Sequence, residues 1–389
     1  MSIFKFGEIL LPENINVTDW GVVACDQYTS QPEYWNTLAT KTSDISSLAL
    51  IFPECFLSSD NSERILSINN KMNEYVQKGI FKEYNGTILV ERTTESGTRR
   101  GIMACIDLSS YSNDFAEKAP IRGTEGVVAE RIPPRVEIRK NASLELPHVM
   151  LLIDDKDKTV IEPLIGKGEK VYDGELNMNG GYIAGYNVQD TTAVELALDK
   201  LFKSSQDKYG SPLLFLVGDG NHSLATAKAC MDESNPLSKY ALVEIVNIYD
   251  EGLKFEPIYR VVYDVDNDDF IKGYTNAVKG GSSTQILTPG KTETIDFIVD
   301  PIEGFAKTQM FIDEYLKTKG GKVDYIHGLD SLREVVEKTK GVGIELKPID
   351  KETFFEYIAK NGPLPRKTFS MGEANEKRYY IECRKINKE

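Results

Sequence analysis

An apolar run that stops at glycines and polar residues constrains this chain more than any other feature. Residues 213–224 read LLFLVGDGNHSL, and residues 224–230 are rich in helix formers. The apolar residues 213–217 predict a buried strand, so residues 218–223 predict the turn between that strand and a helix. A plain connection of this kind does not need two glycines, an acid, an amide, an imidazole and a hydroxyl. The turn is therefore the first candidate for a functional site.

The composition of this turn is suited to binding an anion. Backbone N–H groups at the start of a helix carry partial positive charge, and Gly218 and Gly220 let a ligand approach the backbone closely. Asp219 can hold a metal ion or accept a proton, and His222 can donate to a phosphoryl oxygen or transfer a proton. Ser223 can donate a hydrogen bond to phosphate. The alternative is that Asp219 and Ser223 only cap the helix and His222 is structural.

A second group of polar residues follows a short apolar strand near the N-terminus. The segment VVACDQYTSQPEYW (22–35) places Asp26 at the strand end, where a carboxylate is well placed for catalysis. The other candidates in it are Tyr28, Thr29, Ser30 and Glu33. Capping of a helix that starts near residues 31–32 explains Asp26 equally well.

A third group lies in the charged segment 121–141. Residues 135–139 read RVEIR, and their alternation predicts a strand with its charged side chains on one face. Guanidinium groups suit phosphate or carboxylate, whereas the alternative is a solvated strand face with cross-strand ion pairs. The candidates are Arg122, Glu125, Arg135, Glu137 and Arg139.

A fourth group, LPRKTFSM (364–371), is basic and rich in hydroxyls. Arg366 and Lys367 could close over a phosphate from a second domain. The alternative is an ordinary surface strand.

Length and charge restrict the class of protein. A chain of 389 residues is long enough for two domains, and a formal net charge of −14 argues against a nucleic-acid surface. The N-terminus shows no signal-peptide pattern and no apolar run approaches the ~20 residues of a membrane span. Five cysteines without a CxxC pair are typical of free thiols in a reducing cytosol. We therefore expect a cytoplasmic protein whose partners are small molecules, with no nucleic acid and no membrane.

The order of predicted elements indicates a mixed α/β (α+β) protein. Apolar spacing predicts a helix over 62–80, and a hairpin is expected where two strand-like runs flank Glu95-Ser96-Gly97. Two further strands are expected within 241–263. An acidic, turn-rich stretch after Tyr263 places a domain boundary near residue 265, which gives domains 1–265 and 266–389.

Several segments together resemble the family catalogued as domain of unknown function 1015, whose members carry Asp-Gly-(His/Asn)-His after an apolar strand. The resemblance extends over nearly the whole chain. The segments are GDGNHSLATAKA (218–229), VVACDQYTSQPEYW (22–35), the run 121–155, VNIYDEGLKFEPIYR (246–260), VDYIHG (323–328) and GPLPRKTFSMGEANEKRYYIECRKI (362–386).

That family in turn resembles the ParB and sulfiredoxin-like fold, which also hosts free L-serine kinases with an Asp-Gly-His-His-Arg turn. The resemblance implies a ParB/sulfiredoxin-like core with N-terminal additions and a smaller C-terminal α+β domain. It implies that Asp219 contacts metal or substrate and that His222 contacts phosphate, within a cradle of Gly218, Gly220, Asn221 and Ser223. The implied activity is Mg²⁺-dependent phosphorylation of free L-serine, a step toward cysteine.

This chain departs from the kinase pattern at Asn221, where His is common, and at Ser223, where Arg is common. Loss of that arginine removes a charge that would meet a nucleotide phosphate, which favours pyrophosphate as donor. Arg122, Arg135, Arg139, Arg366 and Lys367 are candidates to replace the charge, and Glu125 or Asp26 is expected to accept the hydroxyl proton. Tyr28, Thr29, Ser30, Glu33 and Glu137 are expected near the acceptor.

Three alternatives stay open at this point. One is a kinase that uses ATP or ADP on serine or another small hydroxyl compound. The second is a non-catalytic ParB-like regulator that binds nucleotide. The third is a sulfiredoxin-like thiol enzyme, which would need a reactive cysteine such as Cys230. A homodimer is compatible with each of them.

Overall fold

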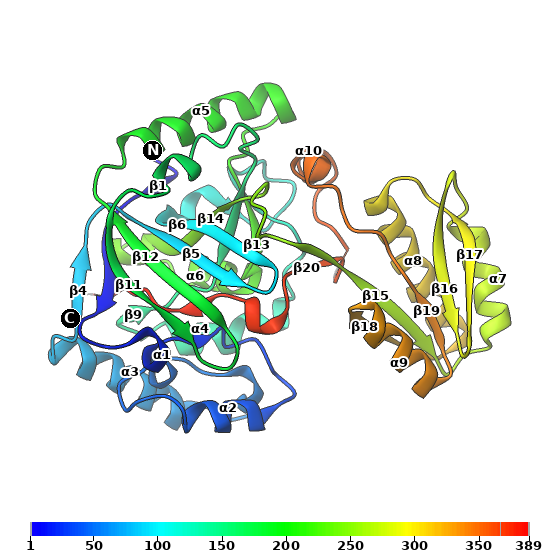
Figure 1. Cartoon of the computed structure of the whole chain (residues 1–389), viewed down its shortest axis with the longest axis horizontal. Coiled ribbons are helices and arrows are strands. Elements are labelled where there is room, and N and C mark those ends of the chain that lie inside the picture. The colour runs from blue at the N-terminus through cyan, green and yellow to red at the C-terminus, as the bar shows by residue number, and fades with distance from the viewer. Residues whose placement is uncertain (1, 366, 388–389) are drawn as a thin grey trace. The chain divides into compact units, whose positions relative to one another are not determined.

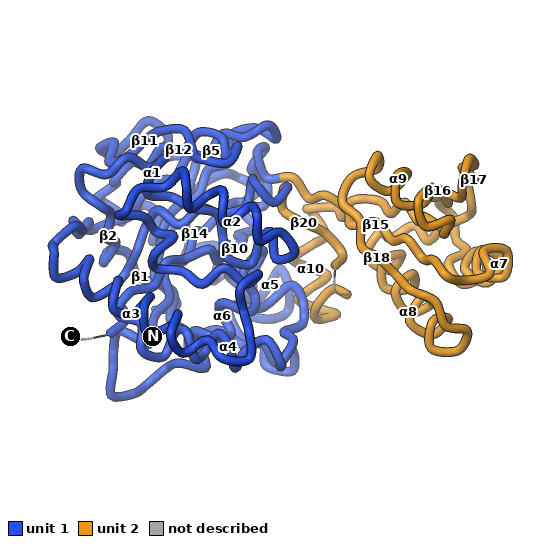
Figure 2. Tube along the Cα trace, turned by 90° about the horizontal axis from the view of Figure 1, so that it is seen from below, with its two compact units in different colours: residues 1–253, 373–389 blue, residues 254–372 orange. Residues whose placement is uncertain are grey.

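The computed structural model describes residues 2–365 and 367–387 and forms two compact units. Unit 1 comprises residues 1–253 and 373–389, and unit 2 comprises residues 254–372 (Figure 2). The boundary therefore lies earlier than the one expected near residue 265, because the strand that begins at Phe255 pairs only with strands of unit 2. The C-terminal residues, expected in the second domain, belong to unit 1.

Unit 1 is built on a mixed ten-stranded sheet, which agrees with the predicted α/β class (Figure 1). In spatial order its strands are β11 (Glu169–Leu176), β12 (Gly181–Val188), β5 (Thr87–Thr94), β6 (Gly97–Asp107), β14 (Tyr240–Asn247), β10 (Met150–Ile153), β13 (Phe215–Asp219), β8 (Ile121–Gly123) and β7 (Tyr111–Ser112), with β1 (Phe4–Lys5) paired to β6. The pairs β10–β14, β13–β8 and β7–β8 are parallel and the others are antiparallel. The predicted hairpin is confirmed as β5–β6.

Both faces of this sheet are buried, because alternate residues of each strand enter different cores. Ile88 and Val90 pack on one face with α2 (Pro32–Ala39) and α3 (Ser62–Gln77), whereas Leu89 packs on the other with α5 (Thr192–Tyr209) and α6 (Asn221–Ala229). The helix predicted over 62–80 is confirmed as α3. Unit 1 also contains α1 (Val17–Trp20), α4 (Ile132–Arg139) and the 3₁₀ turns η1 (Ser47–Leu50), η2 (Glu54–Phe56), η3 (Leu108–Ser110), η4 (Ala129–Arg131), η5 (Glu162–Leu164), η6 (Pro236–Lys239) and η7 (Ala374–Glu376).

The prediction of a strand over residues 135–139 is wrong, because these residues form the helix α4. Pro133 and Pro134 stand in its first turn, where a missing N–H costs no hydrogen bond and the fixed φ favours a helix. Arg135 and Arg139 are four residues apart, so they still share one face. Glu137 lies away from that face, is exposed, and pairs with Lys140 at 2.6 Å.

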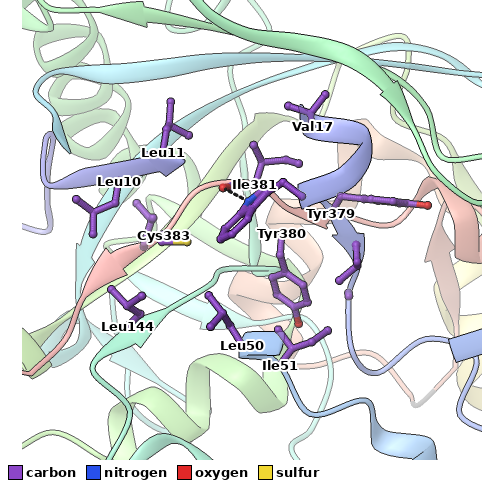
Figure 3. Close-up of a cluster of buried hydrophobic side chains, with 14 of the residues drawn as sticks. Leu10, Leu11, Val17, Leu50, Ile51, Leu144, Tyr379, Tyr380, Ile381 and Cys383 are labelled. Carbon is purple, nitrogen blue, oxygen red and sulfur yellow. Dashed lines mark hydrogen bonds between the residues drawn. The ribbon is translucent and has the colours of Figure 1, made fainter. Parts of the chain in front are cut away.

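The C-terminal segment 373–387 passes through the core of unit 1 (Figure 3). It forms β21 (Tyr379–Tyr380), which pairs with β3 (Val22–Val23), and β22 (Arg384–Lys385), which pairs with β9 (Leu144–Glu145). Between them Cys383 exchanges backbone hydrogen bonds with Leu10 of β2 (Ile9–Pro12), a strand that pairs with β4 (Phe81–Tyr84). The buried Trp20 indole donates to the Ile381 carbonyl at 2.9 Å. Unit 1 is therefore complete only when the end of the chain is in place.

Unit 2 is a six-stranded sheet with its own helices. Its strands are β17 (Lys291–Phe297), β16 (Ser282–Thr288), β19 (Val342–Ile344), β15 (Phe255–Tyr263) and β18 (Lys322–His327), with β20 (Phe369–Met371) paired to β15, and its helices are α7 (Asn267–Ala277), α8 (Pro301–Lys319), α9 (Leu329–Thr339) and α10 (Lys351–Asn361). Phe255 is opposite Met371, so the two ends of this inserted unit meet.

Candidate active site

The predicted strand, turn and helix are present with shifted bounds: β13 extends through Asp219, Gly220 is the turn, and α6 begins at Asn221, so residues 221–223 belong to the helix. Met150 of β10 is opposite Asp219 and Leu151 is opposite Val217, so Gly218 is bulged out of the ladder, and a bulge redirects the strand end. Gly220 has φ 84°, and a Cβ there would lie 2.9 Å from the Val149 backbone. Only glycine fits this position without strain, and with no side chain it leaves the start of α6 uncapped.

Asp219 is held between the turn and the C-terminal segment. Its Oδ1 accepts from the Gly220 N–H at 2.9 Å, and its Oδ2 lies 3.2 Å from the Lys377 ammonium. The carboxylate is a quarter exposed and Lys377 is 12 % exposed. The turn thus presents a cation and a carboxylate beside the N-terminus of a helix.

Asn221 contributes a buried side-chain oxygen that has no hydrogen-bond partner among the described residues. It approaches β8 closely, because a Cβ at Gly123 would lie 2.8 Å from Asn221 Oδ1. Buried polar atoms are rarely left unpaired, so a group placed here gains a hydrogen bond at little cost. This is a second feature of the turn that fits a ligand.

His222 anchors the loop after β8 rather than transferring a proton at Nε2. The Val128 N–H donates to His222 Nε2 at 3.0 Å, so that nitrogen is an acceptor and the ring proton is on Nδ1. Burial, followed by the charges of Arg135 and Arg131, lowers the pKa of His222 to about 4. At neutral pH His222 is therefore uncharged and can donate a hydrogen bond to an anion from Nδ1.

This environment makes the stability of unit 1 pH-dependent. His222 has an ordinary pKa of about 6.5 when unfolded and about 4 when folded, so the unfolded state binds more protons between these values and stability falls as the pH is lowered through this range. His222→Gln keeps an acceptor for the Val128 N–H but cannot become charged, so we expect the stability of this variant to change less with pH. Urea midpoints at pH 7, 5.5 and 4.5 measure this, with His327→Gln as the control. The same change of urea midpoint with pH in wild type and in His222→Gln would contradict the lowered pKa of His222.

A compact polar cluster surrounds the predicted candidate Asp26. His148 Nε2 lies 4.0 Å from Asp26 Oδ2, and His148 Nδ1 is 2.7 Å from the Tyr380 hydroxyl, which also accepts from the Cys25 N–H. Burial by itself raises the pKa of Asp26, but His148, the Gln27 amide and Lys377 outweigh it, so the pKa lies below its ordinary value. Asp26 is ionised at neutral pH and can accept a hydrogen bond from a hydroxyl.

A cavity of about 130 Å³ lies beside this cluster and the first turns of α6. One part of its wall is apolar and includes Phe52, Leu57, Met72 and Ile138. The polar residues that line it are Cys25, Glu54, Arg135, Arg139, Glu145, His148, Ser223, Thr226 and Tyr380. The cavity therefore offers both signs of charge next to an apolar surface.

Ion pairs hold both arginines of α4 at this cavity. Arg135 pairs with Glu54, and its second nitrogen donates to the Arg131 carbonyl at 2.7 Å. Arg139 pairs with Glu145, which Arg384 also contacts at 2.8 Å. The structure thus brings Arg135, Arg139 and Ser223 together, as expected of a shared site.

The other candidates, including Asp26, Asp219 and His222, are not among the residues that line the cavity. Arg122 is buried and donates to the Ala119 and Pro212 carbonyls and to Ser211, so its predicted phosphate contact is corrected to support of the segment that precedes β13. Glu125 lies in the loop that Val128 ties to α6, two residues after β8.

The candidates after Asp26 are mostly exposed. Tyr28 stacks on Tyr34 with ring centroids 3.7 Å apart and has φ 51°, an unusual conformation for a tyrosine. Thr29, Ser30 and Glu33 are exposed, with Glu33 in the first turn of α2. Lys367 belongs to unit 2, and Arg366 lies outside the described residues.

The cysteines do not favour thiolate chemistry. Burial raises the pKa of Cys230 and, with Asp26, raises that of Cys25 to about 12. The nucleophilic form of a cysteine is the thiolate, and these shifts lower the thiolate fraction of both residues at neutral pH. This disfavours the sulfiredoxin-like alternative.

Sequence reasoning missed His148, Lys377 and Tyr380. His148 had a usable signal in its rarity, because the chain has three histidines. Lys377 and Tyr380 lie in the segment 362–386 that carries the family resemblance, but their role depends on the path of the C-terminal segment through unit 1.

The described residues contain no group of three or more His, Cys, Asp or Glu side chains that could hold a metal ion. Asp219 is a single carboxylate at the turn. This fits Mg²⁺ that is held largely by substrate phosphates, because Mg²⁺ commonly takes one or two carboxylates together with phosphate oxygens. It does not fit an ion held by the protein alone.

Residues 6–386 match the model of the family described as Protein of unknown function (DUF1015). No curated protein matches the chain. Among the helices of the described part of the chain, none is long and apolar enough to cross a bilayer.

Three solved structures are similar to parts of this chain. A conserved hypothetical protein from Pyrococcus furiosus is 14% identical with a TM-score of 0.37, covering 72% of this chain and 90% of its own. A free serine kinase mutant in complex with ADP is 12% identical with a TM-score of 0.40, and the match covers 73% of this chain and 91% of the kinase. SbnI from Staphylococcus aureus, with a C-terminal truncation, is 8% identical with a TM-score of 0.38, and the match covers 69% of this chain and 82% of SbnI.

Proposed function

The chain belongs to the family described as Protein of unknown function (DUF1015), and from its site we propose that it is a phosphotransferase that moves a phosphoryl group from pyrophosphate to the hydroxyl of free L-serine. One observation carries this proposal. The uncapped start of α6 with its Asp219–Lys377 pair and the ionised Asp26 cluster occur together in unit 1, and Ser223 of α6 and His148 of the cluster line one cavity with charges of both signs.

The turn supports binding of the donor. Phosphoryl transfer depends mostly on positioning and on neutralising charge. The N–H groups at the start of α6, the Nδ1–H of His222 and the ammonium of Lys377 are donors of the kind that phosphate oxygens accept. Mg²⁺ that enters with the donor would neutralise further phosphate charge, and Asp219 is the residue to hold it.

The cluster around Asp26 supports activation of the acceptor. An ionised carboxylate can accept the serine hydroxyl proton as the oxygen attacks phosphorus, which leaves orthophosphate and O-phospho-L-serine. Charge pairs such as Glu54–Arg135 can exchange partners with the ammonium and carboxylate of an amino acid. Glu125, the other candidate base, remains a prediction that Glu125→Gln tests in the same assay.

The apolar wall of the cavity favours a second candidate function, a kinase that uses ADP or ATP. Phe52, Leu57 and Met72 offer the kind of surface that an adenine or another apolar group contacts, and such walls are typical of ligand cavities. The resemblance to free L-serine kinases in the sequence supports the same acceptor for both candidates.

A thermal-shift series separates the two donors. A ligand that binds only the folded state stabilises it by mass action, by about 2.7 kcal/mol at a concentration 100 times its dissociation constant. We expect pyrophosphate to raise the melting temperature and ADP and ATP to leave it unchanged, with orthophosphate and sulfate as anion controls. A rise in melting temperature with nucleotide alone would indicate that a nucleotide, and not pyrophosphate, is the donor.

A further inference from the structure

Lys377 is buried to a degree that its structural contacts do not explain. Its side chain is 12% exposed, whereas in the other lysine ion pairs identified among the described residues the lysine is between 32% and 70% exposed. An ammonium group is strongly hydrated, and lysines are rarely buried without a reason. Its burial at the turn therefore indicates a role there.

The neighbouring residue holds Lys377 in place. The Arg378 carbonyl accepts from the Ala24 N–H at 2.9 Å, and the Arg378 guanidinium is clamped by Glu244 and Glu382 at 2.9 and 2.6 Å. This clamp fixes the backbone one residue beyond Lys377. It also brings Lys377 close to the strand end that carries Asp26, whose pKa Lys377 helps to lower.

Lys377 has one ion-pair partner among the described residues, Asp219. An ammonium group has three N–H donors, so this pair leaves donors for a further anion. The carboxylate also accepts from the Gly220 N–H and therefore stays with the turn when the ammonium turns away. A lysine on a flexible stem is suited to such an exchange of partners.

We propose that Lys377 is the phosphate-binding cation of the turn: it pairs with Asp219 in the free protein and contacts the phosphoryl donor when the donor binds. This rests on the proposed function, since the donor is the anion that it would meet. A corollary concerns divalent ions. Because Lys377 already neutralises the Asp219 carboxylate, a divalent ion binds the donor-free protein in competition with it.

Two equilibrium measurements test this role without turnover. Calorimetry in EDTA measures the affinity for pyrophosphate, and electron paramagnetic resonance measures Mn²⁺ binding without a donor. Loss of one hydrogen bond to a charged group corresponds to a weakening of about 10- to 100-fold, which we expect for K377M with pyrophosphate. We expect K377R to stay close to wild type with pyrophosphate, and K377M to bind Mn²⁺ more tightly than wild type.

K239M is the matched control, because Lys239 also makes an ion pair with a carboxylate, Asp107 at 2.9 Å, but not with a residue of the turn. It changes the net charge equally and should leave both affinities unchanged. If K377M does not fold, K377Q provides a second neutral variant for the same measurements.

The outcomes distinguish this role from the proposed function. Wild-type protein that binds pyrophosphate, together with K377M that binds it equally well, overturns the role of Lys377 and leaves the proposed function standing. Wild-type protein that fails to bind pyrophosphate with or without Mg²⁺ contradicts the proposed donor and, with it, this role. Weaker pyrophosphate binding in K239M to the same degree as in K377M also overturns the role, because it reveals only a general charge effect.

Discussion

Asp26→Asn is expected to reduce kcat/KM for phosphoryl transfer by about 10²- to 10⁴-fold, the usual contribution of a positioned general base. The substitution keeps the shape of the side chain and removes the charge that accepts the hydroxyl proton. Asp26 is ionised at neutral pH because His148, the Gln27 amide and Lys377 together outweigh the effect of burial. Initial rates at fixed pyrophosphate and varied serine measure the effect.

Asp154→Asn is the matched control for this prediction. Asp154 also follows a strand of unit 1, but it pairs with Lys208 at 2.5 Å and accepts from the Tyr249 hydroxyl at 2.8 Å, whereas Asp26 lies beside His148. Its activity should stay near wild type. Asp26→Asn with a rate within about threefold of wild type would exclude Asp26 as the base and direct attention to Glu125.

Arg378→Met is expected to destabilise unit 1 by about 3–5 kcal/mol, because removing one partner leaves buried charges uncompensated. Arg378 is 4% exposed, and the carboxylates of Glu244 and Glu382 that it pairs with are 1% and 0% exposed. It also donates to the Pro147 and Tyr379 carbonyls. Urea unfolding followed by tryptophan fluorescence measures the change, since Trp20 and Trp35 both lie in the core of unit 1.

A compensated variant separates buried charge from lost packing. Arg378→Met combined with Glu382→Gln removes the carboxylate charge that Arg378 balances at 2.6 Å, and Glu244 is kept because Arg99 also pairs with it at 3.7 Å, so most of the lost stability should return. Failure of the double variant to recover, or a loss below about 1 kcal/mol in the single variant, would contradict the importance assigned to this ion-pair network.

Local patterns predicted those parts of the fold whose cause is local. The apolar spacing of 62–80 and the run 213–217 correspond to α3 and β13, and the turn that begins α6 lies where its glycines indicated. The alternation of residues 135–139 led to the wrong prediction of a strand. Over so few residues, a short strand and a two-turn amphipathic helix can have the same spacing of apolar residues. The preceding Pro133-Pro134 was the signal that could have decided between them.

The site was only partly predictable because long-range packing assembles it. Asp219 and Lys377 are 158 positions apart in the chain, and the path of the last residues through unit 1 brings them together. Arg122 shows the reverse case. Its guanidinium donates hydrogen bonds to the carbonyls of Ala119 and Pro212, and no pattern of residue types predicts these contacts.

Phosphorus NMR of the protein with Mg²⁺ and L-serine tests the central claim most directly. Parallel samples receive pyrophosphate, ADP or ATP, and Asp26→Asn protein serves as the matched blank. The account predicts O-phosphoserine and orthophosphate in the pyrophosphate sample alone, formed at least about 100-fold more slowly by the variant. Absence of O-phosphoserine from every wild-type sample would contradict the proposal that this site phosphorylates serine.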